Sequence, residues 1–349
     1  MSSKRVIRIG NVSIGGDNPV AVQSMTNTDT KDTERTVEQI LALEREGCEI
    51  IRVAAYDVDA ARNIRNIRER IHIPLVADVH FDHRIAIAAM ENGADKVRIN
   101  PGNIGGSEKI KMVADAARMH HIPIRVGANT GSLAKKYHET DRSTALFESA
   151  MENVRALESF GFEDIVVALK SSDVNETVKA YRLMDREVDY PLHVGITEAG
   201  GYERSIIKSS IGIGSLLLDG IGDTIRVSIT GDPLLEIGVA KDILQFSGRR
   251  VFGPDIIACP TCGRTRIDLE ALYGQVSELV KDIRKNIKIA VMGCVVNGPG
   301  EARGADLGIA GGEGEGVIFI KGEPVKKVDE EHLLDEFRKV LMEYIGEDK

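Results

Sequence analysis

The segment PVAVQSMTNTDTKDTERTVEQILALEREGCEIIRVAA (19–55) decides the fold class, because it contains one complete strand–helix–strand unit. Its two ends, PVAVQSM (19–25) and EIIRVAA (49–55), are short apolar runs of the kind that parallel sheets bury on both faces. Between them, DTERTVEQILALEREG (32–47) has the apolar period of an amphipathic helix and ends at a glycine, as many helices do. The segment therefore predicts a parallel βαβ unit.

Similar units repeat through the first 245 residues. Six further strands are predicted, at PLVADVH (74–80), KVRINP (96–101), IPIRVGAN (122–129), DIVVALK (164–170), PLHVGIT (191–197) and DTIRVSIT (223–230). Helical patterns such as HRIAIAAMENG (83–93) and STALFESAMENVRALESFG (143–161) separate them. Eight apolar strands that alternate with helices predict an α/β fold, a (β/α)8 TIM-type barrel. An open doubly wound sheet is the second possibility, although no GxGxxG motif opens the first helix.

A change of pattern follows QFSGRRVFGPD (245–255), so we expect a barrel over residues 1–250 and a small α+β domain over 251–349. The tail predicts a helix at 276–285, a strand at 287–294, a hairpin from 306–312 and 316–322, and a helix at 330–346. This small domain carries three of the four cysteines of the chain.

The composition of the 349 residues excludes several classes of protein. The net charge of −9 and the pI of about 5.5 argue against nucleic acid as the main partner, because a phosphate backbone requires a basic surface. No apolar run reaches the ~18 residues that would span a membrane, and MSSKRVIRIG (1–10) has no apolar signal region. Four cysteines are too few for a disulfide scaffold. We therefore expect a cytoplasmic protein without a membrane or nucleic-acid partner.

Three cysteines near the end of the chain predict a metal centre. Cys259 and Cys262 lie in CPTCGRT, and Cys294 lies in MGCVVNGPGEA. A closed structural zinc site usually has four ligands, whereas an iron–sulfur cluster held by three thiolates leaves one iron for another ligand. Glu301 is the candidate for that position. A zinc ribbon, or zinc bound by three cysteines and Glu301, remains the alternative; Cys48, far upstream, is expected to be a small buried hydrophobe.

Cations in the barrel strands predict an anionic ligand. Four strands place an arginine between apolar residues and a fifth ends in a lysine: Arg52, Arg98, Arg125, Arg226 and Lys170. Because side chains alternate along a strand, these cations point into the barrel, where an unpaired charge is costly. Arginine suits phosphate oxygens, and barrels bind ligands at the carboxyl ends of their strands. Alternatively, each arginine pairs with an internal acid such as Asp78 or Glu198.

Other polar residues stand at the same strand ends and complete the candidate site. We expect hydrogen bonds to the ligand from Asp78, His80, Asn100, Asn129 and Ser228. Glu198 is a candidate acid or base beside the anion. His193 is either part of the site or a core histidine with satisfied hydrogen bonds.

Three segments identify a family resemblance. GNVSIGGDNPVAVQSMTNTDT (10–30), ACPTCGRT (258–265) and GCVVNGPGEA (293–302) closely resemble the 4-hydroxy-3-methylbut-2-enyl diphosphate synthases, iron–sulfur enzymes of the methylerythritol phosphate route to isoprenoids. The likeness runs over nearly the whole chain, and the length is similar to that of the short bacterial form.

The resemblance implies an activity and its parts. The activity would be the reductive ring opening and dehydroxylation of 2-C-methyl-D-erythritol 2,4-cyclodiphosphate to (E)-4-hydroxy-3-methylbut-2-enyl diphosphate. Two electrons would pass through a [4Fe–4S] cluster from reduced ferredoxin or flavodoxin. The family's cluster ligands match Cys259, Cys262, Cys294 and Glu301, and its diphosphate-binding residues match Arg52, Arg98, Arg125, Asn129, Lys170, Arg226 and Ser228. Glu198 matches the family's glutamate near the substrate carbons, and a homodimer is implied.

The residues alone leave two other functions open. One is a zinc-dependent barrel lyase or transferase that acts on a phosphorylated metabolite. The other is a regulatory barrel with a zinc-ribbon docking module.

Overall fold

The structure is a computed structural model of the chain and describes residues 5–133, 135–137, 139–294 and 302–347. The chain divides into two compact units, with the division between Arg250 and Val251. Among the described residues, every helix falls short of the length and apolarity that crossing a bilayer requires.

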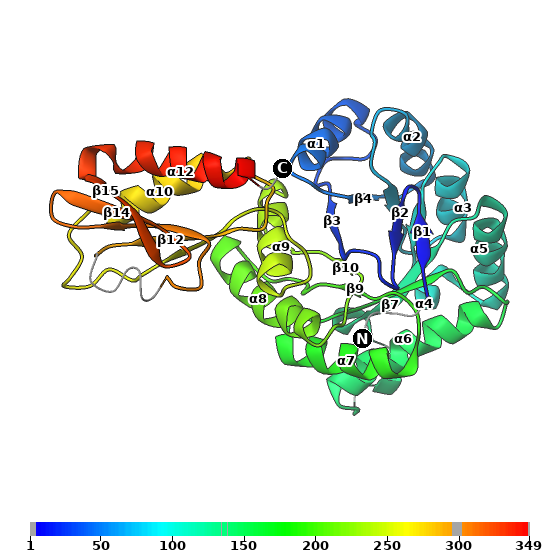
Figure 1. Cartoon of the computed structure of the whole chain (residues 1–349). Helices are drawn as coiled ribbons and strands as arrows, with labels where there is room; N and C mark the ends of the chain where they lie inside the picture. The colour runs from blue at the N-terminus through cyan, green and yellow to red at the C-terminus, as the bar shows by residue number, and fades with distance from the viewer. Residues whose placement is uncertain (1–4, 134, 138, 295–301, 348–349) are drawn as a thin grey trace. The chain divides into compact units, whose positions relative to one another are not determined.

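The first unit contains a parallel barrel (Figure 1). Its strands are β3 (Ala21–Met25), β4 (Ile50–Ala54), β5 (Leu75–Asp78), β6 (Lys96–Arg98), β7 (Ile124–Asn129), β8 (Ile165–Lys170), β9 (His193–Val194) and β10 (Thr224–Ile225). They pair in the order β8-β7-β6-β5-β4-β3-β10-β9. A parallel bridge between Val167 and Leu192 joins the two ends of this order. The predicted TIM-type barrel is therefore confirmed, and the open sheet is wrong.

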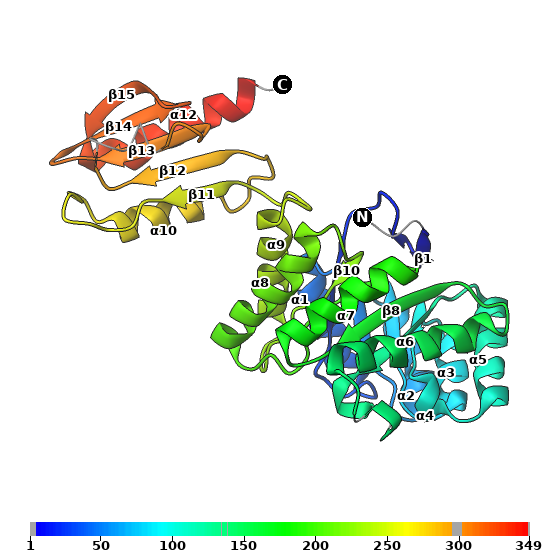
Figure 2. The same ribbon diagram turned by 90° about the horizontal axis from the view of Figure 1, so that it is seen from below.

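Helices cover the outside of the strands (Figures 1 and 2). They are α1 (Thr33–Arg45), α2 (Val58–Arg68), α3 (His83–Glu91), α4 (Pro101–Ile104), α5 (Ser107–His120), α6 (Arg142–Glu158), α7 (Val174–Glu187), α8 (Tyr202–Leu218) and α9 (Leu234–Phe246). Aspartates begin several of them; Asp32, for example, accepts a hydrogen bond from the backbone N–H of Arg35 at 3.2 Å. The face of α1 with Val37, Ile40 and Leu43 is buried, as its apolar period predicts.

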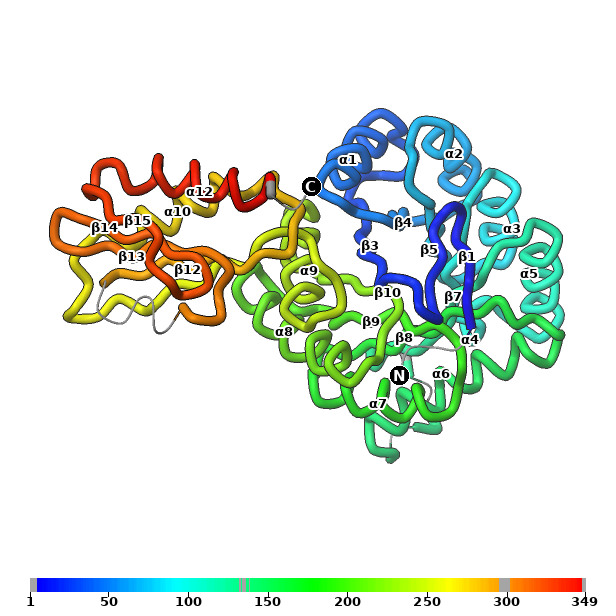
Figure 3. Tube along the Cα trace, in the orientation of Figure 1, coloured from blue at the N-terminus to red at the C-terminus, as the bar shows by residue number. Residues whose placement is uncertain are grey.

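An antiparallel hairpin, β1 (Ile7–Ile9) and β2 (Val12–Ile14), precedes the barrel (Figure 3). Sequence analysis did not predict it. Its Ile7, Ile9 and Ile14 are buried in one cluster with residues from barrel strands: Ala21, Ile50, Val76 and Val166. These barrel residues lie at or near the starts of their strands, so the hairpin covers the amino-terminal end of the barrel. A ligand must therefore enter at the carboxyl ends.

The second unit is a mixed sheet covered by helices. Its strands are β11 (Asp255–Ala258), β12 (Lys288–Met292), β13 (Leu307–Gly311), β14 (Glu315–Ile320) and β15 (Glu323–Asp329), paired in this order. β11, β12 and β13 are parallel, whereas β14 is antiparallel to both neighbours. The predicted hairpin is the β13–β14 pair, and the predicted last helix is α12 (Leu333–Glu347).

One helix of this unit differs from its prediction. α10 spans Leu269–Val280 rather than 276–285, because Asp268 begins it by accepting from the backbone N–H of Ala271 at 3.0 Å. Leu269, Leu272, Val276 and Val280 form its buried face. The unit has its own core, which includes Ile289, Ile309, Ile318, Phe337 and Leu341.

Candidate active site

Strand alternation directs the cations into the barrel. Ile50 on β4 and Val76 on β5 face inward, because both belong to the cluster beneath the hairpin. Two residues later, Arg52 and Asp78 occupy the same face, nearer the carboxyl end. The sequence pattern of an arginine between apolar residues therefore corresponds to an inward-facing cation on this strand.

Asp78 brings two of the predicted arginines together. Its Oδ1 lies 3.0 Å from Nη1 of Arg98, and its Oδ2 lies 3.6 Å from Nε of Arg52. Nε2 of His80 lies 3.2 Å from the same Arg98 nitrogen. Burial opposes ionisation of the Asp78 carboxyl, but the charges of Arg52 and Arg98 hold its pKa well below the ordinary value. Asp78 is therefore an ionised partner of the arginines.

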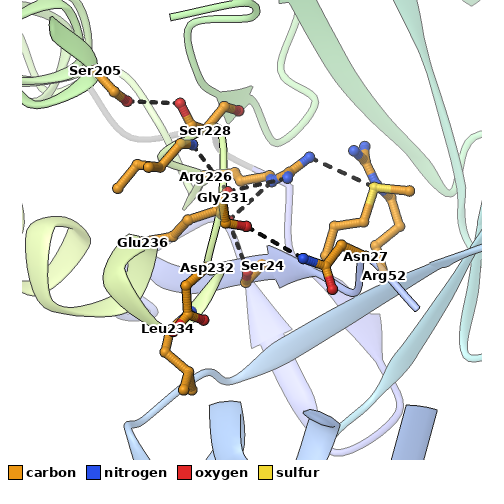
Figure 4. Close-up of polar contacts among 12 residues, drawn as sticks. Ser24, Asn27, Arg52, Ser205, Arg226, Ser228, Gly231, Asp232, Leu234 and Glu236 are labelled. Carbon is orange, nitrogen blue, oxygen red and sulfur yellow. Dashed lines mark hydrogen bonds and ion pairs between the residues drawn. The ribbon is translucent and has the colours of Figure 1, made fainter. Parts of the chain in front are cut away.

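A second carboxylate, Glu236 in the first turn of α9, pairs with Arg226 (Figure 4). Its Oε1 lies 3.3 Å from Nη2 of Arg226, and its Oε2 accepts from the Ser24 hydroxyl at 2.7 Å. The backbone N–H of Ile229 also donates to it at 3.1 Å. Sequence analysis missed Glu236; the available signal was a single glutamate in the apolar stretch LLEIGVA (234–240).

The sulfur of Met25 connects the two arginine clusters. It lies 3.0 Å from Nε of Arg52 and 3.6 Å from Nη1 of Arg226. Burial lowers the pKa of Arg52 to about 10, and the charge of Asp78 opposes this change. Arg52 of β4 and Arg226, the residue after β10, therefore both contact the last residue of β3.

Two predicted cations have no carboxylate partner in the part of the chain that the structure describes. They are Arg125, whose Nε and Nη1 are buried without a hydrogen bond, and Lys170. Burial, and then the charges of neighbouring arginines, lower the pKa of each well below its ordinary value. Internal acids thus account for Arg52, Arg98 and Arg226 but leave Arg125 and Lys170 unmatched.

Sequence analysis also missed Lys96, the first residue of β6. This lysine is completely buried, and its Nζ has no hydrogen-bond partner among the described residues. His193, which sequence analysis left undecided, is equally buried. Its Nδ1 lies 2.7 Å from the Thr224 hydroxyl, whereas its Nε2 has no partner within the described part of the chain. The available signal for Lys96 was a lysine two residues before Arg98 on the same strand.

The remaining predicted residues lie at the carboxyl ends of the strands. Asn129 ends β7 opposite Lys170 of β8, and its Oδ1 accepts from the N–H of Gly131 at 3.3 Å. Asn100 precedes α4 and is half-buried. Ser228 follows β10, and its carbonyl accepts from the Ser205 hydroxyl at 2.7 Å (Figure 4).

Glu198 follows β9 and is exposed. Its backbone has a φ of 52°, in the left-handed region that non-glycine residues seldom adopt. Such a backbone persists only where the surrounding structure imposes it, and it is frequent at ligand sites.

Cysteines of the second unit follow the carboxyl ends of two neighbouring strands of its sheet. β11 and β12 are parallel neighbours, so Cys259 after β11 and Cys294 after β12 leave the same end. The N–H of Gly293 donates to Sγ of Cys259 at 3.3 Å, and the N–H of Arg266 donates to the Gly293 carbonyl at 3.1 Å. These bonds hold the CPTCGRT loop beside the residue that precedes Cys294.

The state of the thiols fits metal binding, although the ligand set is incomplete in the described residues. All four cysteines are free, and a hydrogen bond from the backbone of Arg264 lowers the pKa of Cys262. Glu301 lies outside the described residues. Within the described ranges, no three cysteine, histidine, aspartate or glutamate side chains are grouped to hold a metal ion.

Comparison with known proteins identifies the family. Residues 4–241 match the family described as the GcpE TIM-barrel domain, and residues 255–343 match the GcpE protein C-terminal domain. The chain is 57% identical over 347 residues to the 4-hydroxy-3-methylbut-2-en-1-yl diphosphate synthase (flavodoxin) of Caldanaerobacter subterraneus subsp. tengcongensis, with 99% of this chain and 98% of that protein covered. The chain belongs to the GcpE family. The synthase of the same name from Clostridium perfringens is 54% identical to the chain over 340 residues, with 97% of each chain covered.

Solved structures support the fold of the GcpE barrel. A dihydropteroate synthase from Yersinia pestis matches with a TM-score of 0.54 and 10% identity, covering 70% of this chain and all of that one (100%). A dihydropteroate synthase from Stenotrophomonas maltophilia matches with a TM-score of 0.52 and 15% identity, covering 69% and 96%. At such low identity these matches show a shared barrel only.

Proposed function

We propose that this chain converts 2-C-methyl-D-erythritol 2,4-cyclodiphosphate to (E)-4-hydroxy-3-methylbut-2-enyl diphosphate, as a flavodoxin-dependent oxidoreductase. The observation that carries the proposal is the identity of 57% over almost the full length of a synthase of that name, across both family domains. The cations in the barrel and the CPTCGRT loop beside Cys294 also support the proposal, because they suit a diphosphate and a metal cluster.

The barrel unit binds the diphosphate in this proposal. Its binding residues are Arg52, Asp78, His80, Arg98, Asn100, Arg125, Asn129, Lys170, Arg226 and Ser228. Arginine forks match phosphate oxygens, and their donors replace the water that the anion loses on entry. Arg125 and Lys170 support the assignment most, because neither has a carboxylate in the described residues to neutralise it. Asp78 orients Arg52 and Arg98 before the ligand arrives.

The second unit holds a [4Fe–4S] cluster in this proposal, through Cys259, Cys262, Cys294 and Glu301. Three observations favour thiolate ligands. Cys259 and Cys294 follow the same ends of two parallel strands, the Gly293 N–H donates to Sγ of Cys259, and the pKa of Cys262 is lowered. When bound, the cluster would supply electrons singly and a Lewis-acidic iron. Glu301 is the replaceable ligand, which lies outside the described residues.

Glu198 holds or transfers a proton near the substrate carbons. Its exposure at the end of β9 keeps its carboxyl accessible to a ligand at the barrel mouth, and its left-handed backbone fixes the turn that carries it. Replacement by glutamine would keep the shape and remove this proton transfer.

The proposal includes three features of the working enzyme. Flavodoxin, named for the relatives, is the electron donor, with ferredoxin as the alternative. The enzyme is a homodimer, in which the barrel of one protomer would use the cluster domain of its partner. Free cysteines and a reduced cluster suit a reducing compartment, so we place it in the cytoplasm.

Anaerobic metal analysis and a turnover assay test the proposed function. The purified chain should contain four irons and form the linear diphosphate from the cyclic one when reduced flavodoxin is supplied. Cys294→Ser should lose iron and turnover. Cys48→Ser is the matched control, because Cys48 is buried in the barrel unit and should leave both unchanged. One zinc per chain and no iron would favour the lyase or transferase instead.

A further inference from the structure

Deep in the barrel, four buried side chains have polar atoms without partners in the described residues. They are Gln23, with both amide atoms, Lys96 at Nζ, Arg125 at Nε and Nη1, and His193 at Nε2. They come from β3, β6, β7 and β9, and none is more than 1% exposed. We call these four residues the lower tier.

The register sets Lys96 and Arg125 of the lower tier beside residues that the hairpin covers, and Arg125 also pairs with Arg98 of β6. Lys96 pairs with Val76 of β5, and Arg125 pairs with Val166 of β8. Both valines belong to the cluster that the hairpin covers. Lys96 also lies two residues before Arg98, so its backbone is about 7 Å deeper along the strand.

The charges around Lys96 are positive. Those that act on it most come from Arg125 of β7 and Arg52 of β4. His193 of β9 is acted on by Arg125, Lys170 and then Lys96, which places these groups near one another. Gln23 of β3 is neutral, and Asp78 of β5 already pairs with Arg52 and Arg98. A buried donor without a partner costs about 1–3 kcal/mol, so the lower tier is complete only with an anion or water.

The proposed reaction changes the charge of its diphosphate. The cyclic substrate carries one negative charge on each phosphate. Breaking the ring C–O bond leaves the oxygen and the electron pair on phosphorus, so that phosphate becomes a terminal group with an extra charge. The balance is one cyclic dianion, two electrons from flavodoxin and one proton, giving one linear trianion and one water. A site that stabilises the developing charge therefore benefits from a side chain that becomes positively charged as the phosphate gains its extra negative charge.

We propose that Lys96 is a further diphosphate-binding residue, which takes up a proton to bind the terminal phosphate that ring opening creates. This inference rests on the proposed function and names the group that favours the linear over the cyclic diphosphate. Gln23 and His193 are further buried side chains of the lower tier whose polar atoms can bind the same ligand. Burial, and then Arg125, lower the pKa of Lys96 well below its ordinary value in the free protein. A bound anion raises that pKa again.

Binding measurements on the holoenzyme without an electron donor test this inference, because no turnover then occurs. Calorimetry compares the linear product with the cyclic substrate in the unaltered protein, in Lys96→Met and in Lys111→Met. Lys111 is an exposed lysine of α5 paired with Asp115, so its replacement is the matched control. We expect Lys96→Met to weaken binding of the linear diphosphate about 10- to 100-fold, as for a lost charged hydrogen bond, and binding of the cyclic one much less.

The pH dependence supplies an independent readout. A proton that binds with the ligand makes affinity fall as pH rises from the lowered pKa of Lys96 in the free protein to its higher pKa in the complex. The unaltered protein and Lys111→Met should show this fall for the linear diphosphate, and Lys96→Met should lack it. Ionisation of the ligand itself is common to all three proteins, so the difference isolates Lys96.

The binding results distinguish failure of the inference from failure of the proposed function. If Lys96→Met binds the linear diphosphate as the unaltered protein does, the inference is wrong and the proposed function stands. If the unaltered protein binds neither diphosphate, the proposed function itself is wrong. Should Lys96→Met fail to fold, titrations of the unaltered protein in two buffers of different ionisation enthalpy decide: net proton uptake supports the inference, and none overturns it.

Discussion

Individual side chains set how much positive charge the barrel presents. Asp78 compensates Arg52 and Arg98, and Glu236 compensates Arg226. Arg125 and Lys170 have no such carboxylate among the described residues. The interior therefore has a net positive charge before any ligand binds. Arginines that already have partners are oriented, whereas the unmatched cations supply the attraction.

Asp78→Asn tests this balance through the pH dependence of stability. The folded-state pKa of Asp78 lies well below its ordinary value of 3.8, so its contribution is present above that value and is lost as pH falls through the lower one. The substitution should lower the free energy of unfolding at neutral pH by about 3 kcal/mol, because it leaves the buried Arg52 and the half-buried Arg98 without their carboxylate. The difference from the unaltered protein should shrink toward acid pH.

Urea unfolding between neutral and strongly acid pH measures this effect. Asp17→Asn is the control, since Asp17 is exposed and should change stability by less than about 0.5 kcal/mol at any pH. A constant difference between Asp78→Asn and the unaltered protein across the pH range would contradict the assignment of Asp78.

Among the elements, the β1–β2 hairpin determines which end of the barrel is closed to a ligand. Ile9 and Ile14 are completely buried against barrel residues near the strand starts, so that end is closed by apolar packing. The carboxyl ends carry the polar residues and the short segments around α4 and Glu198. A site at the other end of the barrel would have required polar residues where these isoleucines lie.

Ile9→Ala should destabilise the barrel unit by about 2–5 kcal/mol, because it removes a buried side chain and leaves a cavity. Val6→Ala changes an exposed neighbour, 56% accessible, and should have an effect below about 0.5 kcal/mol. Thermal and chemical unfolding followed by circular dichroism measures both. Equal effects of the two substitutions would mean that the hairpin does not seal the barrel.

At the scale of the whole molecule, each unit has its own hydrophobic core. The core of the second unit is drawn from α10, α12 and its sheet, whereas the barrel core lies within the first 250 residues. The cations of the candidate site belong to the first unit, whereas Cys259, Cys262 and Cys294 belong to the second. Binding of the diphosphate and loading of the metal are therefore expected to stabilise different units.

Scanning calorimetry of the full chain tests this separation. Cyclic diphosphate at 100 times its dissociation constant should stabilise the barrel unit by about 2.7 kcal/mol and raise its unfolding temperature by about 5–10 °C. The transition of the cluster unit should move little. Sodium chloride of equal ionic strength is the control for screening. A single transition that shifts as a whole would contradict independent unfolding.

The sequence by itself determined the barrel, the presence of cations on its strands and the location of three of the four cysteines in the second unit. These follow from short-range rules: a period of two or 3.6 residues, caps at helix ends, and the spacing of a CxxC motif. The predicted start of α10 was wrong because the cap at Asp268 sets it, several residues before the strongest apolar period. The hairpin was missed because its three-residue strands are too short for a periodic signal.

Only the tertiary structure decided which cations have partners. Glu236 meets Ser24 across 212 residues of sequence, and Met25 meets Arg226 across 201. Such contacts arise when the barrel closes and brings the last strand beside the first, and no local pattern encodes them. For the same reason the sequence could not distinguish Lys96 from an ordinary strand lysine. The structure shows that it is completely buried and that Arg125 and Arg52 are its charged neighbours.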